Sequence, residues 1–263
     1  MCSYRLLSDL LESDAIGGRR VFRLLLPEDR RGAVPLLILL HGVHGSETDW
    51  TDKGNLTAVI TDMTMSGRMS PMAVLMPSDG LTGLGTGYLN WAEGGSHRYE
   101  TYLLDELLPE VERRYEVGGT RRLRSISGLS MGGFAALGIG LRFPGRVAAA
   151  SSLSGFFDAR ELAPLVGDET FNRMFGGSEE AMDRVSPLCM ELRSPGGYPT
   201  LAFDCGEDDS YAGMNRELHR RLDSADIPHT YREYKGAHTW DYWSGRIGEH
   251  LALHDRVFRQ VGS

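Results

Sequence analysis

The sequence predicts an α/β fold with a largely parallel sheet. Two stretches, "PLLILLHG" at 35–42 and "MAVLMP" at 72–77, are continuous apolar runs, which are typical of strands buried on both faces of a parallel sheet. In "YETYLLDELLPEVERRY" at 99–115, apolar residues recur at helical spacing with carboxylates between them. Strand-like and helical stretches then alternate to the end of the chain, which favours right-handed crossovers within one sheet.

The other elements follow from the same patterns, taken in chain order. The stretch "RRVFRLLLP" at 19–27 alternates polar and apolar residues and ends at a proline, so we expect an early, half-exposed strand. Further strands are expected at "RLRSISG" (122–128), "VAAASSLSG" (147–155), "PTLAFDCG" (199–206) and "HTYREYKG" (229–236). Helices are expected at "GGFAALGIGLRF" (132–143), at "GMNRELHRRLDSAD" (213–226) and from about 239 to 261.

Length and composition predict one ordinary globular domain. The 263 residues are 41% apolar and 24% charged, and they contain neither a repeat nor a linker, so we expect a single domain over residues 1–263. Residues 156–195 are less regular, with Gly, Pro and short helical pieces. We expect this segment to be a small, lid-like insertion over one edge of the sheet.

Charge and cysteine usage exclude several classes of partner. The net charge of -8 disfavours nucleic acid and anionic membranes, which require a basic face. Three scattered cysteines indicate neither a disulfide framework nor a thiolate metal site. The first residues do not resemble a secretion signal, and the longest apolar run is too short to cross a bilayer, so we expect a cytoplasmic protein without membrane insertion.

The stretch "SISGLSMGGFAAL" at 125–137 places Ser130 in the pattern G-x-S-x-G between a predicted strand and a predicted helix. This context is typical of a nucleophile elbow, a sharp turn that lifts a serine hydroxyl above the sheet. Side chains at 128 and 132 would collide with neighbouring segments, which explains the two glycines. The alternative is a glycine-rich helix N-cap, where serine is also common.

A serine nucleophile requires a base and a group that orients the base. Of the histidines after Ser130, only His238 lies in a loop between a strand end and a helix start, which is where a base could reach the serine. The orienting acid is expected after the strand that ends at Gly206, where Asp208 and Asp209 fit equally well. No metal or other cofactor is expected in this site.

Two backbone N–H groups are needed to bind the oxyanion that forms when the serine attacks. Met131, directly after the serine, supplies one of them. The second is expected in "LLHGVHGSETDW", where Val43 is preferred and Gly42 and Gly45 are alternatives. Aromatic and polar residues in loops at the carboxyl edge of the sheet are candidates for substrate binding. These candidates are Asn90, Trp91, Phe156 and Trp240.

With these residues in place, the sequence resembles the putative esterase family of α/β-hydrolases. The family holds esterase D-type S-formylglutathione hydrolases, tributyrin esterases, feruloyl esterases and antigen 85 mycolyltransferases. The similarity covers nearly the whole chain: "LLHGVHGSETDW", "VLMPSDG", "RYETYLLDELLPEVERRY", "SISGLSMGGFAALGIGLRFPGRVAAASSLSG", "DCGEDDSYAGMNRELHRRL" and "GAHTWDYW" follow one another in the family's order. The resemblance implies Asp209 as the acid, Asn215 as the family's asparagine and His238 as the base. Ser210 and His44 depart from the family's pattern.

The resemblance implies a serine carboxylesterase that hydrolyses short-chain acyl or aryl esters through an acyl-enzyme. A thioesterase of the S-formylglutathione hydrolase type and an acyltransferase are alternatives with the same residues. A catalytically inactive binding module on a hydrolase scaffold is the alternative of another class. A zinc hydrolase using His41 and His44 is disfavoured because no metal-ligand motif accompanies them. The expected partner is a small ester or thioester, and self-association into a homo-oligomer is compatible with the sequence.

Overall fold

The computed structural model of the chain describes residues 3–30, 32, 34–79, 85–193 and 196–260. Its strands form one eight-stranded sheet, in the order β1-β2-β4-β3-β5-β6-β7-β8. From β4 to β8 neighbouring strands are parallel, whereas β1, β2 and β4 pair antiparallel. The strands are β1 (Tyr4–Ser13), β2 (Gly18–Pro27), β3 (Leu36–Leu40), β4 (Ala73–Pro77), β5 (Arg124–Leu129), β6 (Ala149–Leu153), β7 (Thr200–Gly206) and β8 (His229–Tyr234). The α/β-hydrolase fold predicted from the sequence is confirmed.

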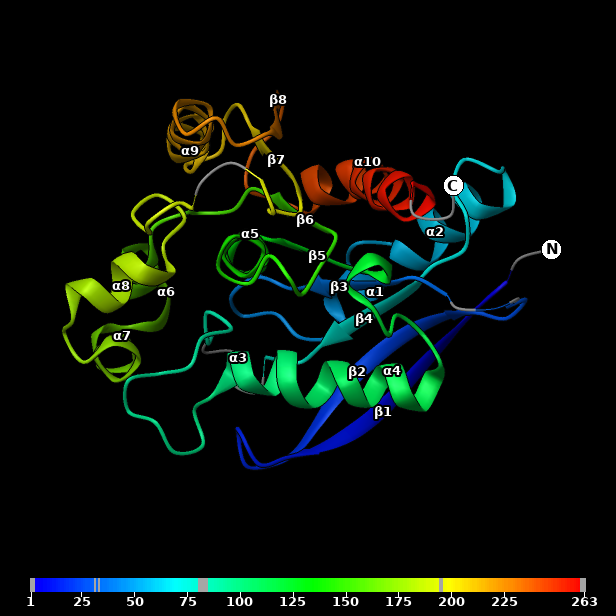
Figure 1. Cartoon of the computed structure of the whole chain (residues 1–263), viewed down its shortest axis with the longest axis horizontal. Coiled ribbons are helices and arrows are strands. Elements are labelled where there is room, and N and C mark those ends of the chain that lie inside the picture. Colours follow the sequence, from blue (N-terminus) through cyan, green and yellow to red (C-terminus); the bar gives the residue numbers. More distant parts are fainter. Residues whose placement is uncertain (1–2, 31, 33, 80–84, 194–195, 261–263) are drawn as a thin grey trace.

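Helices cover both faces of this sheet (Figure 1). On one face, α1 (Asp49–Asp52), α2 (Leu56–Met65) and α10 (Trp240–Arg259) enclose one apolar core. On the other face lie α3 (Tyr99–Thr101), a π-helical turn η1 (Tyr102–Leu107), α4 (Leu108–Tyr115), α5 (Met131–Arg142) and α9 (Ala212–Ser224), which enclose the second core. A short 3-10 turn, η2 (Arg121–Leu123), leads into β5.

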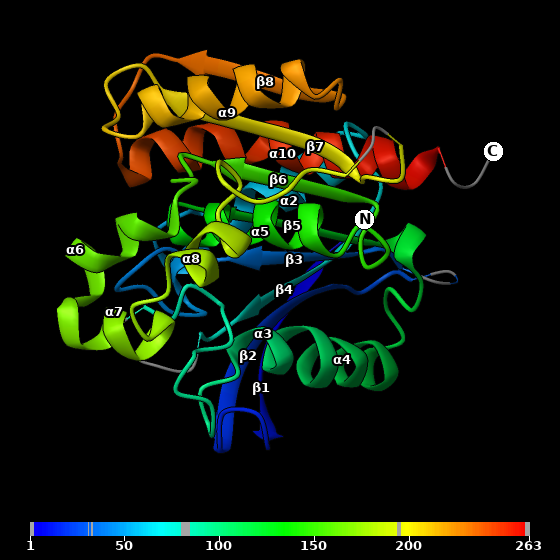
Figure 2. The same ribbon diagram turned by 60° about the vertical axis from the view of Figure 1, so that its left-hand side comes forward.

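The segment between β6 and β7 is helical. It contains η3 (Ala159–Leu162), α6 (Ala163–Val166), α7 (Asp168–Phe175) and α8 (Glu179–Val185), which lie together to one side of the sheet (Figure 2). Backbone N–H groups of Ala92 and Glu93 donate to carbonyls of α7, so the segment is fastened to the loop after β4. That the whole chain is one domain with this segment as an insertion stays a prediction.

Three details differ from what the sequence pattern predicts. The edge strand β1 and the helix α2 were not expected. Strand β2 is not half-exposed over its carboxyl half: Leu24 packs into one core and Leu25 into the other. The reason is that helices cover both faces of this half of the strand: Leu24 shares a core with residues of α4, and Leu25 shares the other core with residues of α2 and α10. The predicted helix at 99–115 is present, but its middle is π-helical, with the Leu108 N–H donating to Leu103 O.

Candidate active site

Ser130 lies at the sharp turn between β5 and α5. Its backbone has φ 53° and ψ −118°, a conformation that L-residues rarely adopt. The turn is tight because a Cβ added at Gly128 would lie 2.4 Å from the carbonyl carbon of Gly132. A Cβ added at Gly132 would lie 2.6 Å from His41 O. The two glycines of the G-x-S-x-G pattern are therefore required by the backbone itself.

A chain of hydrogen bonds joins Ser130, His238 and Asp209. His238 Nε2 lies 3.0 Å from Ser130 Oγ, and His238 Nδ1 lies 2.8 Å from Asp209 Oδ2. A carboxylate only accepts, so Nδ1–H donates to Asp209, and in the neutral ring Nε2 is left to accept the Ser130 hydroxyl proton. This is the arrangement in which a histidine can act as a base toward a serine.

Asp209 is held rigidly in its loop. Its side chain is fully buried, whereas that of His238 is 30% exposed. The Tyr211 backbone N–H donates to Asp209 Oδ1 at 2.9 Å, so each carboxylate oxygen has its own donor. Burial raises the pKa of Asp209, but the hydrogen bonds from His238 and Tyr211 outweigh it, and the pKa lies below its usual value. Of the two acids that the spacing left open, Asp209 contacts His238, whereas Asp208 is exposed.

The loop after β3 lies directly against the elbow. A Cβ added at Gly42 would come within 3.3 Å of Ser130 Cβ. Val43 and Met131 approach each other across Gly85, whose added Cβ would contact a Val43 methyl at 3.1 Å and Met131 Sδ at 3.3 Å. The two predicted oxyanion donors therefore flank the serine from two separate segments. Met131 is also the first residue of α5, where the helix dipole favours an anion.

Two aromatic rings that the sequence did not single out hold the His238 ring. The edges of Tyr211 and Trp243 approach it with ring centroids 5.2 and 4.9 Å away. The fully buried Asn215 connects the loop after β6 to the loop before α9, because its Nδ2 donates to Gly155 O and to Tyr211 O. The sequence could have indicated the contact of Trp243 with His238, because Trp243 follows His238 by five residues and lies in the first turn of the last helix.

The structure places the four predicted substrate-binding residues in different surroundings. Phe156 is fully buried and lies beside Tyr211, and Trp240 contacts Trp243, so one aromatic ring separates each of them from His238. Asn90 instead bonds Thr101 with both its amide atoms, and Trp91 is buried with its indole N–H donating to Thr86 O. These contacts give Asn90 and Trp91 a part in packing the loop after β4, and a role in binding substrate stays a prediction for all four.

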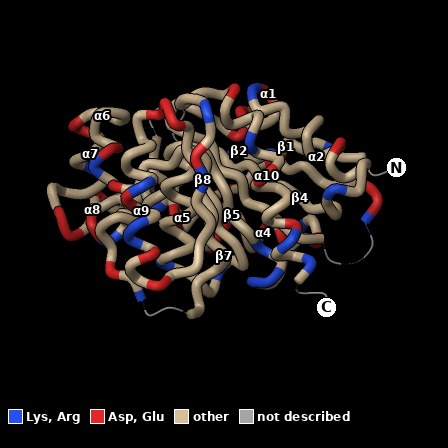
Figure 3. The backbone as a smooth tube through the Cα atoms, turned by 90° about the horizontal axis from the view of Figure 1, so that it is seen from above, with Lys and Arg blue, Asp and Glu red and all other residues tan. Residues whose placement is uncertain are grey.

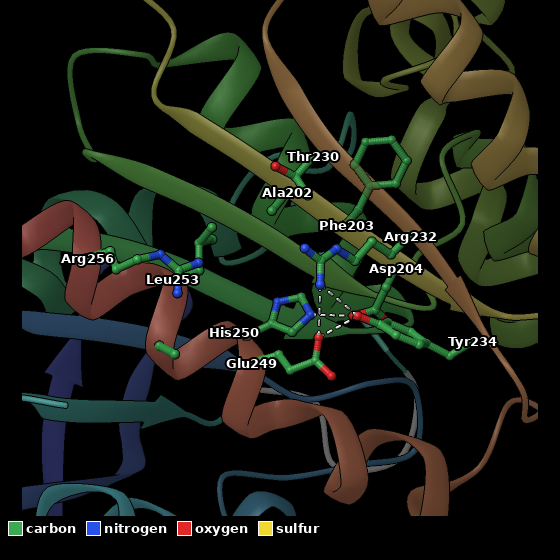
Figure 4. Close-up of a pocket in the computed structure, with 11 residues that line it drawn as sticks. Ala202, Phe203, Asp204, Thr230, Arg232, Tyr234, Glu249, His250, Leu253 and Arg256 are labelled. Carbon is green, nitrogen blue, oxygen red and sulfur yellow. Dashed lines mark hydrogen bonds and ion pairs between the residues drawn. The ribbon is translucent and has the colours of Figure 1, made fainter. Parts of the chain in front are cut away.

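A second buried polar network lies between β6, β7 and α10. His250 Nε2 is 2.6 Å from Asp204 Oδ2, and His250 Nδ1 is 2.9 Å from Ser151 Oγ, which also bonds His254 Nε2. A cavity of about 280 Å³ opens beside it (Figure 4). Its lining includes Asp204 and His250 but none of Ser130, Asp209 and His238. The fully buried side chains of Ser151 and His254 link β6 to α10 inside the protein.

Comparisons with known proteins show the family of the chain. Residues 13–254 match the family described as "Putative esterase". The chain belongs to this family. The esterase is 27% identical to an acetyl esterase of Caldicellulosiruptor saccharolyticus over 80% of its own length and 79% of that protein. It is also 27% identical to Esterase Rv1288 of Mycobacterium tuberculosis, of which it spans about half the length (54%). Its activity class is that of a carboxylic ester hydrolase.

Solved structures show the same fold for this esterase. It is similar to an S-formylglutathione hydrolase from Agrobacterium tumefaciens, with a TM-score of 0.82 and 18% identity over 97% of this chain and 96% of that one. A ferulic acid esterase matches with a TM-score of 0.76 and 24% identity over 98% and 100% of the two chains. The resemblance inferred from the sequence motifs is thereby confirmed at the level of family and fold.

The surface of the esterase carries charges of both signs, and blue and red segments are interspersed along the chain (Figure 3). Within the described residues, none of its helices combines the length and apolarity needed to cross a bilayer. Among the described residues, neither His41 nor His44 lies in a cluster of three side chains that could bind a metal ion.

Proposed function

We propose that the protein is a serine carboxylesterase in which Ser130 is the nucleophile, His238 the base and Asp209 the residue that orients the base. The observation that supports this most strongly is the continuous hydrogen-bond chain from Asp209 Oδ2 through both ring nitrogens of His238 to Ser130 Oγ. Family membership gives the type of bond that is cleaved, and the hydrogen-bond chain supports Ser130, His238 and Asp209 as the residues that cleave it.

Each step follows from the geometry. Ser130 Oγ attacks the ester carbonyl carbon while His238 Nε2 takes the hydroxyl proton, and Asp209 stabilises the imidazolium that forms. The N–H groups of Met131 and Val43 bind the tetrahedral oxyanion. Collapse of this intermediate breaks the bond to the alcohol, which leaves with the proton from His238. Water, activated by the same histidine, then hydrolyses the acyl-enzyme and regenerates Ser130.

For the substrate, we propose short acyl or aryl esters. The acetyl esterase relative covers most of both chains and supports a small acyl group. Half-buried Tyr211, which packs on the buried ring of Phe156, lies beside His238 and offers an aromatic surface next to the site. A thioester is the second candidate, since the same acyl-enzyme forms from either leaving group and an S-formylglutathione hydrolase shares the fold. Acyl transfer would replace water by an alcohol in the last step. A cytoplasmic location and a homo-oligomer stay predictions.

The substrate class can be tested by measuring kcat/KM on p-nitrophenyl acetate, butyrate and octanoate, on methyl ferulate and on S-formylglutathione. We expect the highest value on acetate or butyrate and a steep fall for octanoate. A higher value on S-formylglutathione than on every oxygen ester would establish the thioesterase alternative. Inactivity on all five substrates would contradict the proposal and favour the inactive binding module.

A further inference from the structure

Far from Ser130 in the sheet, three metal-capable side chains converge between α9 and β8. His219 and Asp223 lie one turn apart on α9, and His229 is the first residue of β8. One ligand atom from each, a ring nitrogen or a carboxylate oxygen, lies within 4.8 Å of the other two. The exposed fractions of the side chains are 40% for His219, 62% for Asp223 and 2% for His229, so the group has one buried ligand and two that face solvent.

Hydrogen-bond partners determine which nitrogen of His229 faces the group. Its Nδ1 lies 2.8 Å from the backbone O of Ile227, which can only accept, so Nδ1 carries the proton. The neutral ring therefore presents the lone pair of Nε2. Stacking on Phe203, at 12° between the planes, holds the ring in this orientation. A backbone carbonyl that binds the far nitrogen is the usual support of a metal-ligating histidine.

The hydrogen-bond partners of His219 leave a place for a positive charge beside Asp223. His229 Nε2 lies 2.8 Å from His219 Nδ1, which must donate to it. In a neutral His219 ring this leaves Nε2 as an acceptor, yet Nε2 faces the Asp223 carboxylate at 3.5 Å. Two acceptors facing each other are unfavourable, and either an additional proton on His219 or a metal ion removes the conflict.

We propose that His219, Asp223 and His229 form a binding site for one divalent transition-metal ion such as Zn²⁺. Two imidazoles and a carboxylate are a common ligand set for zinc, cobalt and nickel. Tetrahedral zinc holds its ligand atoms about 3.3 Å apart. The two Asp223 oxygens lie 3.5 Å from His219 Nε2 (Oδ2) and 3.9 Å from His229 Nε2 (Oδ1), so small turns of the exposed His219 and Asp223 side chains would bring the ligand atoms to this spacing. Water completes the coordination.

The place of the site in the fold indicates a structural role. Ser130 follows the carboxyl end of β5, whereas His229 lies at the amino end of β8, so the ion is outside the reaction centre. Helix α9 begins three residues after Asp209, and β8 leads to His238 (Figures 1 and 2). A metal bound by both α9 and the start of β8 therefore stabilises the segment between Asp209 and His238.

Titration of tag-free, chelator-treated protein with Zn²⁺ by calorimetry tests the site, and Co²⁺ absorption in the visible range reports its ligands. We expect one ion per chain, a higher Tm with Zn²⁺ and ester hydrolysis that is unchanged by the metal. His219→Ala and Asp223→Asn should each weaken binding at least tenfold. Asp226→Asn, an exposed carboxylate three residues farther along, is the matched control and should bind like the wild type. Cys189→Ser removes an exposed free thiol and shows whether that thiol, instead of the proposed site, binds the added metal.

The two ligand variants change exposed side chains, and their Tm without metal shows whether they are folded. Loss of binding in both, with binding kept in Asp226→Asn and Cys189→Ser, supports the site. Absence of Zn²⁺ binding in the wild type would overturn it. Equal binding by the wild type and both ligand variants would also overturn it, because the ion would then be held elsewhere.

Discussion

His238 Nε2 lies 3.0 Å from Ser130 Oγ, although 108 residues separate the two in the chain. The distance is short because β5 and β8 belong to the parallel part of one sheet, so the loops that follow them meet at the same edge. The serine is presented by the strained turn at the end of β5, and the histidine comes from the loop between β8 and α10. The proposed chemistry depends on this contact and on the carboxylate behind it.

Asp209→Asn should lower kcat about 10⁴-fold while the protein remains folded. An amide at this position favours the wrong tautomer of His238 and no longer stabilises the imidazolium. Initial rates on p-nitrophenyl acetate measure the effect. Asp208→Asn is the matched control, since this neighbouring carboxylate is exposed, and it should keep its rate within about twofold. Similar losses in both variants would contradict the assignment of Asp209.

Gly132→Ala should destabilise the fold by about 3 kcal/mol or more, since its Cβ would meet backbone atoms that have little room to move. The added carbon would lie 2.6 Å from His41 O and 2.7 Å from Leu40 O. Urea unfolding measures the change. Gly213→Ala is the control, because no atom lies within 4 Å of its added Cβ and α9 accepts alanine well. A Gly132 variant as stable as the wild type would show that the elbow is looser than described.

His254 should make folding stability depend on pH. Burial, and then the neighbouring His250, lower the pKa of His254 to about 3. The unfolded chain binds this proton below about pH 6.5, so the contribution is complete above that pH and is lost as the pH falls toward 3, at roughly 1.4 kcal/mol per pH unit. The free energy of unfolding should therefore fall more steeply for the wild type than for His254→Gln.

Between pH 7.5 and pH 5, the stability difference between the wild type and His254→Gln should shrink by about 2 kcal/mol. Glutamine retains a donor for Ser151 Oγ but does not titrate. Urea unfolding of both proteins at several pH values measures the difference. A difference that stays constant over this range would mean that His254 is protonated in the folded state as readily as in the unfolded state.

The core of the fold and the proposed nucleophile and base were predictable from local patterns, whereas the proposed acid, Asp209, came from the resemblance to the esterase family. A strand buried on both faces and a serine between two glycines each leave a signature within a few residues. Spacing alone did not separate Asp208 from Asp209, since both follow the same strand; burial separates them in the structure.

Elements without a local signature were missed. Strand β1 lies at the edge of the described sheet beside β2, and its sequence YRLLSDLLES places the leucines in adjacent pairs, so apolar and polar residues do not alternate along it. Helix α2 buries Leu56, Ile60 and Met63 at helical spacing, but β-branched residues between them weaken the helical pattern. The group of His219, Asp223 and His229 arises from the pairing of a helix end with a strand start, which a pass along the sequence does not reveal.

The central claim, that Ser130 is the nucleophile, is tested most directly by treatment with an alkyl fluorophosphonate, followed by intact mass and peptide mapping. The account predicts one adduct per chain, located on Ser130 and absent in Ser130→Ala, with labelling much slower in His238→Ala. An unlabelled wild type, or an adduct on another residue that persists in Ser130→Ala, would contradict it.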